Sequence, residues 1–249
     1  MTVSAPLILL FTDFGTDGPY LGQMEAAILG EALQSRVVNL VSDAPCGNPR
    51  ASAYLLAALT DVLPPGCVVA AVVDPGVGGE RDPLLLDVDG RTFVGPDNGL
   101  LSRVAARGHE VSVGRIDWRP ERLSESFHGR DLFAPVAASL STGQMVATSP
   151  MTLQHLQGWE WSDELAEVIY VDHYGNAMTG LWAGGVPRDR KLLVDGRALG
   201  YARTFSAVPA GEAFWYENSC GLVEIAVNQG RAATALGLGV GSGVRWAEI

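Results

Sequence analysis

The chain has 249 residues, with 17 basic and 28 acidic side chains and a formal net charge of −11 at pH 7. This acidity excludes a general nucleic-acid binder, because a polyanion is bound by a basic surface and the chain has a single lysine, Lys191. With 47% hydrophobic and 18% charged residues, the composition is typical of a folded protein with a sizeable core. The length indicates one large domain or two modest ones.

The apolar runs of the sequence are short. The longest, such as residues 7–11 and 67–73, fall far below the roughly 20 residues that a membrane-spanning helix needs. The N-terminus has no basic start followed by an apolar segment and a small-residue cleavage site, so we expect a cytoplasmic protein without a membrane partner. Cys46, Cys67 and Cys220 are odd in number and far apart, which favours buried, hydrophobic-type side chains over a disulfide framework or a zinc site.

Strand patterns alternate with helix patterns in the first part of the chain. The predicted strands are residues 7–12, 37–41 and 67–73, and the predicted helices are residues 20–33 and 49–63. Continuous apolar strands that alternate with helices indicate a mainly parallel sheet covered on both faces. Sites in such sheets lie at the carboxyl ends of the strands. Asp13 and Asp74 each follow a strand, so we expect them at the same edge of the sheet.

The chain continues with a predicted hairpin at the edge of this sheet, in which residues 84–87 and 92–94 are joined through Asp89 and Gly90. Helices are predicted at residues 99–107 and 131–140. The pattern changes between residues 141 and 164. Beyond it, short strands are predicted at residues 167–171, 191–194, 213–216, 222–227 and 233–238, separated by turn residues.

We therefore predict an α/β protein with two domains. Residues 1–162 are expected to form a mainly parallel, Rossmann-like α/β sandwich domain. Residues 163–249 are expected to form a smaller all-β barrel or sandwich domain.

Several familiar catalytic signatures are missing from the sequence. It contains no G-x-S-x-G elbow, no phosphate-binding P-loop and no H-E-x-x-H metal helix. The four histidines are too scattered to indicate a metal cage. The glycine-rich residues 237–243 do not fit a dinucleotide-binding loop and are interpreted as a flexible strand and turn.

Four segments combine polar side chains with glycine and proline: residues 12–15, 74–81, 93–99 and 127–131. Glycine lets a backbone approach a ligand closely, and loops on a rigid sheet often build sites. Each segment also has a purely structural interpretation. A glycine-rich turn is often only a turn, Asp97 and Asn98 are able to cap the following helix, and Arg130 with Asp131 is able to form a local ion pair.

The same segments contain motifs that occur in a fixed order. They are Leu10-Phe-Thr-Asp-Phe-Gly15, Tyr20-Leu-Gly-Gln-Met24, Asp74-Pro-Gly-Val-Gly78 with Arg81, Gly95-Pro-Asp-Asn-Gly99, Phe127-His-Gly-Arg-Asp131 with Phe133-Ala-Pro135, and Asp172-His-Tyr-Gly-Asn176. With these motifs the chain closely resembles the S-adenosyl-L-methionine (SAM) hydroxide adenosyltransferases. These adenosine-forming hydrolases are related to the fluorinase and chlorinase enzymes. The resemblance covers about residues 7–233.

The resemblance implies an N-terminal α/β domain and a C-terminal β-barrel. It implies a homotrimer in which the substrate lies between the N-terminal domain of one subunit and the barrel of its neighbour. The implied reaction is attack of water or hydroxide on the ribose C5′ of SAM, which gives adenosine and L-methionine.

The resemblance assigns Asp74, Arg81 and His128 to the catalytic water. An arginine and a histidine donor stabilise hydroxide, and an aspartate orients the water or takes its proton. No cofactor is implied, because the positive sulfur already activates the leaving group. The structural alternative is that Asp74 forms a turn, Arg81 is a surface charge and His128 packs beside Phe127.

The resemblance also assigns substrate-binding residues, namely Asp13, Asp172, Asn176, Ser219, Glu224 and Val227. Asp13 corresponds to a carboxylate that holds the ribose hydroxyls. Asp172, Asn176 and Ser219 correspond to contacts with the methionine part of the ligand. Glu224 and Val227 lie in the corresponding strand, where Val227 offers backbone groups to adenine. The alternatives are an Asx turn at Asp172 and a place in the barrel core for Val227.

The sequence departs from the family pattern at three positions: Tyr174 replaces the usual phenylalanine, Gly180 replaces a frequent asparagine, and Cys220 stands where the halogenases carry arginine. Two other functions remain open. One is a SAM-dependent halogenase with a halide nucleophile, and the other is a non-catalytic sensor of SAM or adenosine. The presence of aspartate, arginine and histidine together favours water as the nucleophile.

Overall fold

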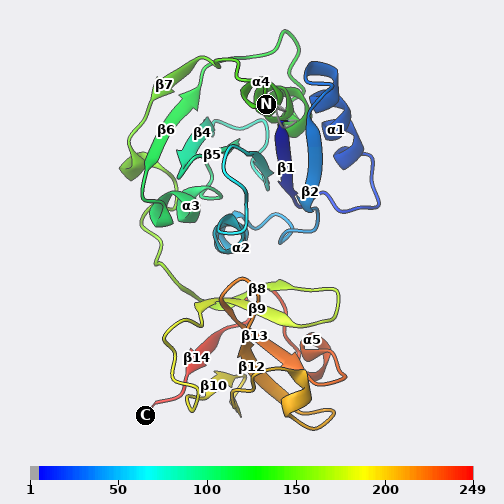
Figure 1. Cartoon of the computed structure of the whole chain (residues 1–249), viewed down its shortest axis with the longest axis vertical. Helices are drawn as coiled ribbons and strands as arrows, with labels where there is room; N and C mark the ends of the chain where they lie inside the picture. The colour runs from blue at the N-terminus through cyan, green and yellow to red at the C-terminus, as the bar shows by residue number, and fades with distance from the viewer. Residues whose placement is uncertain (1–5, 249) are drawn as a thin grey trace, which may run out of the picture. The chain divides into compact units, whose positions relative to one another are not determined.

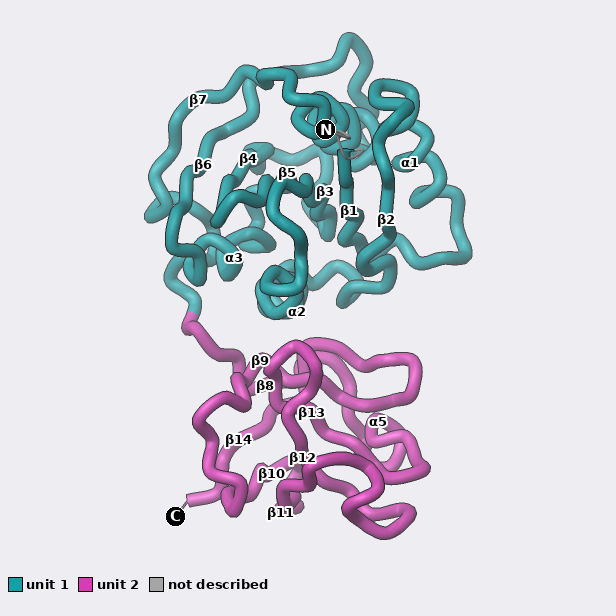
Figure 2. The backbone as a smooth tube through the Cα atoms, viewed as in Figure 1, with its two compact units in different colours: residues 1–161 teal, residues 162–249 magenta. Residues whose placement is uncertain are grey.

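The computed structural model describes residues 6–248, and the chain divides into two compact units (Figure 2). Unit 1 comprises residues 1–161 and unit 2 comprises residues 162–249. The predicted domain boundary lies one residue further along the chain. None of the helices in the described part is both long and apolar enough to cross a membrane.

Unit 1 is built on a seven-stranded sheet with the strand order β2-β1-β3-β5-β4-β6-β7 (Figure 1). The strands are β1 (Leu7–Thr12), β2 (Arg36–Val41), β3 (Val68–Val72), β4 (Pro83–Val88), β5 (Arg91–Pro96), β6 (Val111–Ile116) and β7 (Thr148–Pro150). Strands β2, β1, β3 and β5 are parallel to one another, whereas β5, β4, β6 and β7 pair antiparallel. The sheet is therefore mixed, and the expectation of a mainly parallel sheet was wrong for its second half.

The β4–β5 hairpin lies in the middle of this sheet and not at its edge. Strand β5 pairs with β3 on one side, and β4 pairs with β6 on the other. The sequence did not reveal β6, because its residues Val111–Ile116 are partly exposed and include Gly114. Without β6, the outer side of the hairpin looked like a free edge.

Helices cover both faces of the sheet. They are α1 (Tyr20–Glu31), α2 (Pro49–Thr60), α3 (Ser102–Arg107) and α4 (Ala134–Ser141). Met24 and Ile28 of α1 pack with Val136 of α4 in one buried cluster that includes Leu10 of β1. Side chains alternate along a strand, so Phe11 points to the opposite face, where it is also fully buried. The solid apolar pattern of β1 follows from this burial on both faces.

Unit 2 consists mainly of two antiparallel sheets. The four-stranded sheet has the order β12-β13-β9-β8 and the three-stranded sheet the order β11-β10-β14. The strands are β8 (Leu165–Val171), β9 (Ala177–Trp182), β10 (Leu192–Val194), β11 (Arg197–Leu199), β12 (Ala213–Glu217), β13 (Leu222–Val227) and β14 (Val244–Trp246). Single bridges connect Glu167 with Gly243 and Tyr201 with Trp215. Trp215 is fully buried in the core of this unit.

The predicted strand at residues 233–238 was wrong. This segment forms the short helix α5 (Ala232–Leu236), because its alanines and leucine favour a helix, and Gly237 ends it with a left-handed φ of 67°. Strand β9 was not predicted. Its interior Gly180 lowers the strand signal. A glycine is needed there, because a Cβ at this position would lie 2.6 Å from the Cβ of Leu165.

Candidate active site

Asp13 and Asp74 follow β1 and β3 and line the same pocket of unit 1, which has a volume of about 180 Å³. Parallel strands that lie side by side end at one edge of the sheet, which explains why residues 61 positions apart meet there. His128 also lines this pocket, between the β6 and α4 segments. The remaining lining residues are Phe14, Cys46, Gly47, Val72, Pro75, Val77, Ser126, Phe127 and Gly129.

Asp74, Arg81 and His128 form one continuous chain of hydrogen bonds. The Nε of Arg81 donates to both carboxylate oxygens of Asp74 at 2.9 and 2.8 Å, and Nη2 also donates to this carboxylate. The same Nη2 lies 2.9 Å from Nδ1 of His128. The side chains of Asp74 and Arg81 are only 4% and 8% exposed, so this is a buried ion pair and Arg81 is not a surface charge.

The hydrogen bond from Arg81 defines the tautomer of His128. A guanidinium group only donates hydrogen bonds, so Nδ1 of the imidazole accepts and the ring proton is carried by Nε2. Burial of the ring lowers the pKa of His128, and the positive charge of Arg81 lowers this pKa further. The neutral imidazole therefore has its N–H donor at Nε2.

The loop that carries Asp74 and Arg81 packs closely against the segment before His128. Gly78 has a φ of 80°, and a Cβ on it would lie 2.4 Å from the carbonyl oxygen of Glu125. Only glycine permits both this conformation and this approach. Residues 93–99, another of the four polar segments, contact the backbone directly before Asp74, because Asn98 Nδ2 donates to the carbonyl of Val73 at 2.9 Å. We assign Asn98 a structural role.

His128 precedes a single π-helical turn, Gly129–Phe133, which leads into α4. Such turns are often found at functional sites. Arg130 forms an ion pair with Asp131, and its Nη1 donates to Gln23 Oε1 at 2.9 Å. Asp131 accepts a hydrogen bond from the backbone N–H of Ser124. The local ion pair considered for Arg130 and Asp131 is present, and it fixes the segment that holds His128.

Asp13 lies at an aromatic wall of the same pocket. Its Oδ2 accepts a hydrogen bond of 2.8 Å from the backbone N–H of Gly47, which orients the carboxylate. The rings of Phe14 and Tyr20 pack edge-to-face around Phe127, with centroids 5.6 and 5.4 Å from its own. An oriented carboxylate with remaining acceptor capacity suits sugar hydroxyls.

Unit 2 has a pocket of about 470 Å³. It is lined by Asp172, Tyr174, Asn176, Met178, Phe205, Tyr216, Asn218, Ser219 and Glu224. Four of the predicted binding residues are thus brought together. Val227 is not among the lining residues. Its side chain lies in the core of unit 2, and its carbonyl accepts a hydrogen bond from the backbone N–H of Gly230.

The Asp172–Asn176 segment turns through a backbone bond from the N–H of Gly175 to the carbonyl of Asp172 at 2.9 Å, and the N–H of Asn176 donates to Asp172 Oδ1 at 2.8 Å. The side-chain bond spans four residues, whereas the Asx turn considered from the sequence spans two. Asn176 Nδ2 also donates to Asp172 Oδ2, at 3.0 Å. A carboxylate only accepts, so this contact fixes the orientation of the amide. The Oδ1 of Asn176 then has no hydrogen-bond partner within residues 6–248, although the residue is only 4% exposed.

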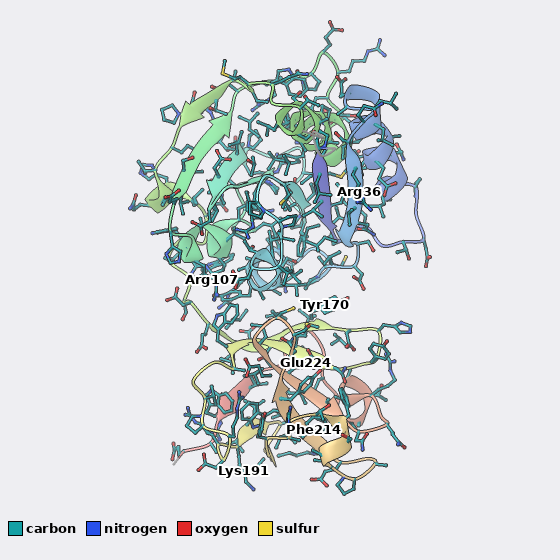
Figure 3. The ribbon with its side chains drawn as sticks, in the orientation of Figure 1. Arg36, Arg107, Tyr170, Lys191, Phe214 and Glu224 are labelled. Atoms are coloured by element: carbon teal, nitrogen blue, oxygen red, sulfur yellow. The ribbon has the colours of Figure 1, made fainter. Side chains whose placement is uncertain are left out.

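Glu224, labelled in Figure 3, belongs to β13. It is 2% exposed. Its carboxyl group accepts hydrogen bonds from the hydroxyl of Tyr216 at 2.6 Å and from Asn218 Nδ2 at 2.7 Å. Burial raises the pKa of Glu224, and the nearby charge of Asp172 adds to this effect. Burial also raises the pKa of the Tyr216 phenol.

The sequence did not identify Tyr216 or Asn218 as residues of this pocket. The signal that could have found Tyr216 is the pairing of β12 and β13, which sets it directly opposite Glu224. Among the cysteines, Cys67 is buried as expected, but Cys46 is exposed and lines the unit 1 pocket, so the expectation was wrong for Cys46. In the described part of the chain, no group of three or more histidine, cysteine or acidic side chains is placed to hold a metal ion.

Relatives of this protein match it over almost its whole length. A protein of Salinispora arenicola (strain CNS-205) named (R)-S-adenosyl-L-methionine hydrolase is 37% identical over 97% of this chain and 98% of its own. A protein of Thermus thermophilus with the same name is 36% identical over 96% of this chain and 98% of its own.

Solved structures share the fold. The crystal structure of an uncharacterised conserved protein from Thermotoga maritima has a TM-score of 0.82 at 27% identity and covers 97% of this chain and 100% of its own. The crystal structure of a conserved hypothetical protein from Thermus thermophilus has a TM-score of 0.76 at 35% identity, over 98% of this chain and 100% of its own.

Two family descriptions also match the sequence. The SAM hydroxide adenosyltransferase N-terminal domain matches residues 8–149, and the C-terminal domain of the same family matches residues 166–245. Together with the near full-length relatives, these matches show that the chain belongs to the SAM hydroxide adenosyltransferase family.

Proposed function

We propose that this protein hydrolyses S-adenosyl-L-methionine at the ribose C5′ to adenosine and L-methionine. The observation that carries this proposal is the hydrogen-bonded chain of Asp74, Arg81 and His128 at a pocket that also contains Asp13. Its chemistry suits a water nucleophile. One neighbour, Asp74, accepts a hydrogen bond from water, and the other, His128, donates one to the water oxygen.

In the proposed step, water binds between the Asp74 carboxylate and Nε2–H of His128. Its oxygen attacks C5′, the C5′–S bond breaks, and the bonding electron pair remains on sulfur. The proton lost by the water goes to Asp74 and from there to solvent. Arg81 keeps both partners in place, because its guanidinium binds the carboxylate and the imidazole at the same time.

The electrostatics of this step favour a pocket with little water. The positive charge of the sulfonium is lost as the transition state forms, and fixed protein dipoles replace bulk water around the reacting groups. The leaving group is a neutral thioether, so the proposed reaction uses neither a metal ion nor a cofactor. Activity that persists in the presence of a metal chelator would support this part of the proposal.

The substrate-binding roles follow from the same proposal. Asp13 binds the ribose hydroxyls, and Asp172, Asn176, Ser219 and Glu224 bind the amino-acid end, with backbone groups of Val227 near adenine. We further propose a homotrimer in the cytoplasm that completes each site with the second unit of a neighbouring subunit. The two bridges between the sheets of unit 2 support closure into a barrel, and the parallel half of the unit 1 sheet supports a Rossmann-like arrangement.

The configuration at the sulfonium sulfur distinguishes two epimers of SAM as substrates. Sulfonium carries three different substituents in SAM and is therefore a stereocentre that inverts slowly. The relatives from Salinispora arenicola and Thermus thermophilus are named for the (R) form. We propose that this protein also hydrolyses the (R) epimer of SAM and leaves the (S) epimer intact. Incubation with a mixture of epimers would then leave (S)-SAM behind, whereas equal loss of both epimers would contradict this preference.

Product analysis tests the proposed reaction against the two other functions. The purified protein is incubated with SAM, with and without chloride or fluoride, and the products are separated by chromatography. Adenosine with an equal amount of methionine in every sample supports hydrolysis. A 5′-halo-nucleoside that appears only with halide would assign the protein to the halogenases, and unchanged SAM would identify a sensor.

A further inference from the structure

We infer that helix α1 positions His128 for the reaction through two of its side chains, Tyr20 and Gln23. Both belong to the Tyr20–Met24 motif, which the proposed step does not use. They act through the residues on either side of His128 and are therefore positioning residues. The inference rests on the proposed function, because it assumes that His128 acts on the water that attacks SAM.

The first contact involves the residue directly before His128. The ring of Phe127 meets the ring of Tyr20 edge-on, with the centroids 5.4 Å apart and the planes at 88°. Phe14 packs against the same ring with a centroid distance of 5.6 Å. Aromatic rings prefer such edge-to-face arrangements. Phe127 is thus held between the loop after β1 and the first turn of α1.

The second contact lies two residues after His128. Arg130 Nη1 donates to Gln23 Oε1 at 2.9 Å. Nε and Nη2 of the same guanidinium group bind the two carboxylate oxygens of Asp131, at 2.6 and 3.0 Å. A guanidinium group is planar and its donors have fixed directions, so the ion pair with Asp131 sets the direction in which Nη1 points. Gln23 accepts from it in that direction.

The two contacts belong to one cluster of four side chains. Tyr20 and Gln23 are three positions apart, so they are neighbours on the surface of α1. Their partners are neighbours as well, because the guanidinium carbon of Arg130 lies 5.3 Å from the ring centroid of Phe127. His128 lies between these two partners in the chain. The cluster therefore holds the backbone on both sides of the histidine.

The segment of His128 depends on such contacts because it has little regular structure of its own. It consists of a loop followed by the single π-helical turn Gly129–Phe133. One helical turn is not stable by itself. Helix α1, in contrast, has 12 residues and is packed into the buried cluster that it shares with α4. The longer helix thus defines the position of the turn, and with it the 2.9 Å contact between His128 and Arg81.

The surroundings of His128 make its position measurable. Burial lowers the pKa of the imidazole most strongly, and the charge of Arg81 lowers this pKa further. Asp74 opposes the shift, whereas Arg119 lowers and Asp131 raises the pKa to a smaller extent. An imidazole that moves out of its buried place and away from Arg81 loses the two largest causes of the shift. Its pKa then rises towards the ordinary value of 6.5.

The test measures kcat and KM for adenosine release from SAM by the full-length protein over a range of pH. Gln23→Met nearly keeps the size of the side chain and removes its acceptor. We expect kcat to fall about tenfold with little change in KM, because a small displacement of a catalytic group has effects of this size. The pH below which kcat decreases should also be higher than in the wild type. An unchanged kcat and pH profile would overturn the inference.

The control is Gln34→Met, which makes the same substitution at an exposed position shortly after α1. It should leave kcat and the pH profile unchanged. Gln23→Glu keeps an acceptor for Arg130 and should have a kcat close to that of the wild type. A kcat of Gln23→Glu as low as that of Gln23→Met would overturn the role of the hydrogen bond to Arg130.

The aromatic contact is tested separately. Tyr20→Leu removes the ring and should change kcat and the pH profile in the same direction as Gln23→Met. Tyr20→Phe keeps the ring and should resemble the wild type. Equal behaviour of the two Tyr20 variants would overturn the role of the ring contact. Calorimetric titration with adenosine identifies variants that are folded and bind the product like the wild type.

These measurements also separate this inference from the proposed function. An active wild-type protein with unchanged kcat and pH profile in Gln23→Met would overturn the inference and leave the hydrolase function intact. No adenosine from SAM with the wild-type protein would overturn the hydrolase function itself.

Discussion

Arg81 Nη2 lies 2.9 Å from Nδ1 of His128, although the two residues are 47 positions apart in the chain. Since the same arginine binds the carboxylate of Asp74, one guanidinium group aligns both side chains at the pocket. The contact fixes the imidazole as a hydrogen-bond acceptor at Nδ1 and as a donor at Nε2.

His128→Ala removes the proposed donor to the water oxygen. We expect kcat for adenosine release to fall by about 10² to 10⁴-fold, which is the usual contribution of such a group. The Kd for adenosine, measured by calorimetry, should change little because the residues proposed to bind ribose and adenine remain. His155→Ala serves as the control, since His155 is an exposed histidine of the same unit. Equal activity of both variants would remove His128 from the reaction.

Arg81→Gln removes the positive charge that helps to lower the pKa of His128. Protonation of Nδ1 would remove the acceptor of the Arg81 hydrogen bond that aligns the imidazole, so we expect kcat to fall as the pH drops through this pKa. This decrease on the acidic side of the pH profile of kcat, the acidic limb, lies below the ordinary histidine pKa of 6.5 in the wild-type protein. Arg81→Gln should move the acidic limb to higher pH.

Arg81→Lys is the matched variant, because it keeps the charge but has no planar fork to bind Asp74 and His128 together. We expect a lower kcat with an acidic limb close to that of the wild type. The pH dependence of kcat measures both variants. An acidic limb that stays in place in Arg81→Gln would contradict the role of the Arg81 charge.

Gly78→Ala should displace the loop that carries Asp74 and Arg81. The new Cβ would lie 2.4 Å from the Glu125 carbonyl oxygen at a backbone φ of 80°, so the loop and the His128 segment have to move apart. We expect a loss of about 1–3 kcal/mol in the free energy of unfolding and at least a tenfold loss of kcat. Gly76→Ala is the control in the same loop, because its Cβ meets nothing closer than 3.9 Å. Similar effects of the two substitutions would contradict the close approach at Gly78.

The raised pKa of Glu224 predicts a pH dependence of stability. The folded protein holds the proton of Glu224 more tightly than the unfolded chain, so this group's contribution to the free energy of unfolding is present below about pH 4.5 and decreases as the pH rises through the raised pKa. Glu224→Gln removes this titration. The unfolding free energy of the wild type minus that of Glu224→Gln, measured with urea, should therefore decrease as the pH rises.

The control for this measurement is Glu212→Gln, which changes an exposed glutamate of unit 2. This variant measures what the loss of a surface carboxylate alone does to the unfolding free energy. A difference for Glu224→Gln that is constant with pH would show that burial does not shift the titration of Glu224.

The strands that carry Asp13 and Asp74 were predictable because a strand buried on both faces is a continuous apolar run. Ordered motifs then pointed to His128, which no periodicity could connect with Asp74. The position of the β4–β5 hairpin was not predictable, since it depends on pairing with β6, whose residues are only partly buried. Local signals do not reveal which strand fills a free edge.

Unit 2 was harder to predict because its strands are short and their partners are distant. Gly180 weakens the signal of β9, although the close contact with Leu165 requires a glycine there. Tyr216 and Asn218 act on Glu224 through cross-strand pairing and a turn, which single-residue patterns do not show. The family resemblance named Glu224, and the structure shows how it is buried and which groups bind it.

The source of the oxygen in the product tests the proposed reaction most directly. The protein is incubated with SAM in water labelled with oxygen-18, and both products are analysed by mass spectrometry. Attack of water on C5′ predicts one labelled oxygen in the 5′-hydroxyl of adenosine and none in methionine. Unlabelled adenosine, or a labelled methionine fragment, would contradict attack at C5′ and with it the role given to Asp74, Arg81 and His128.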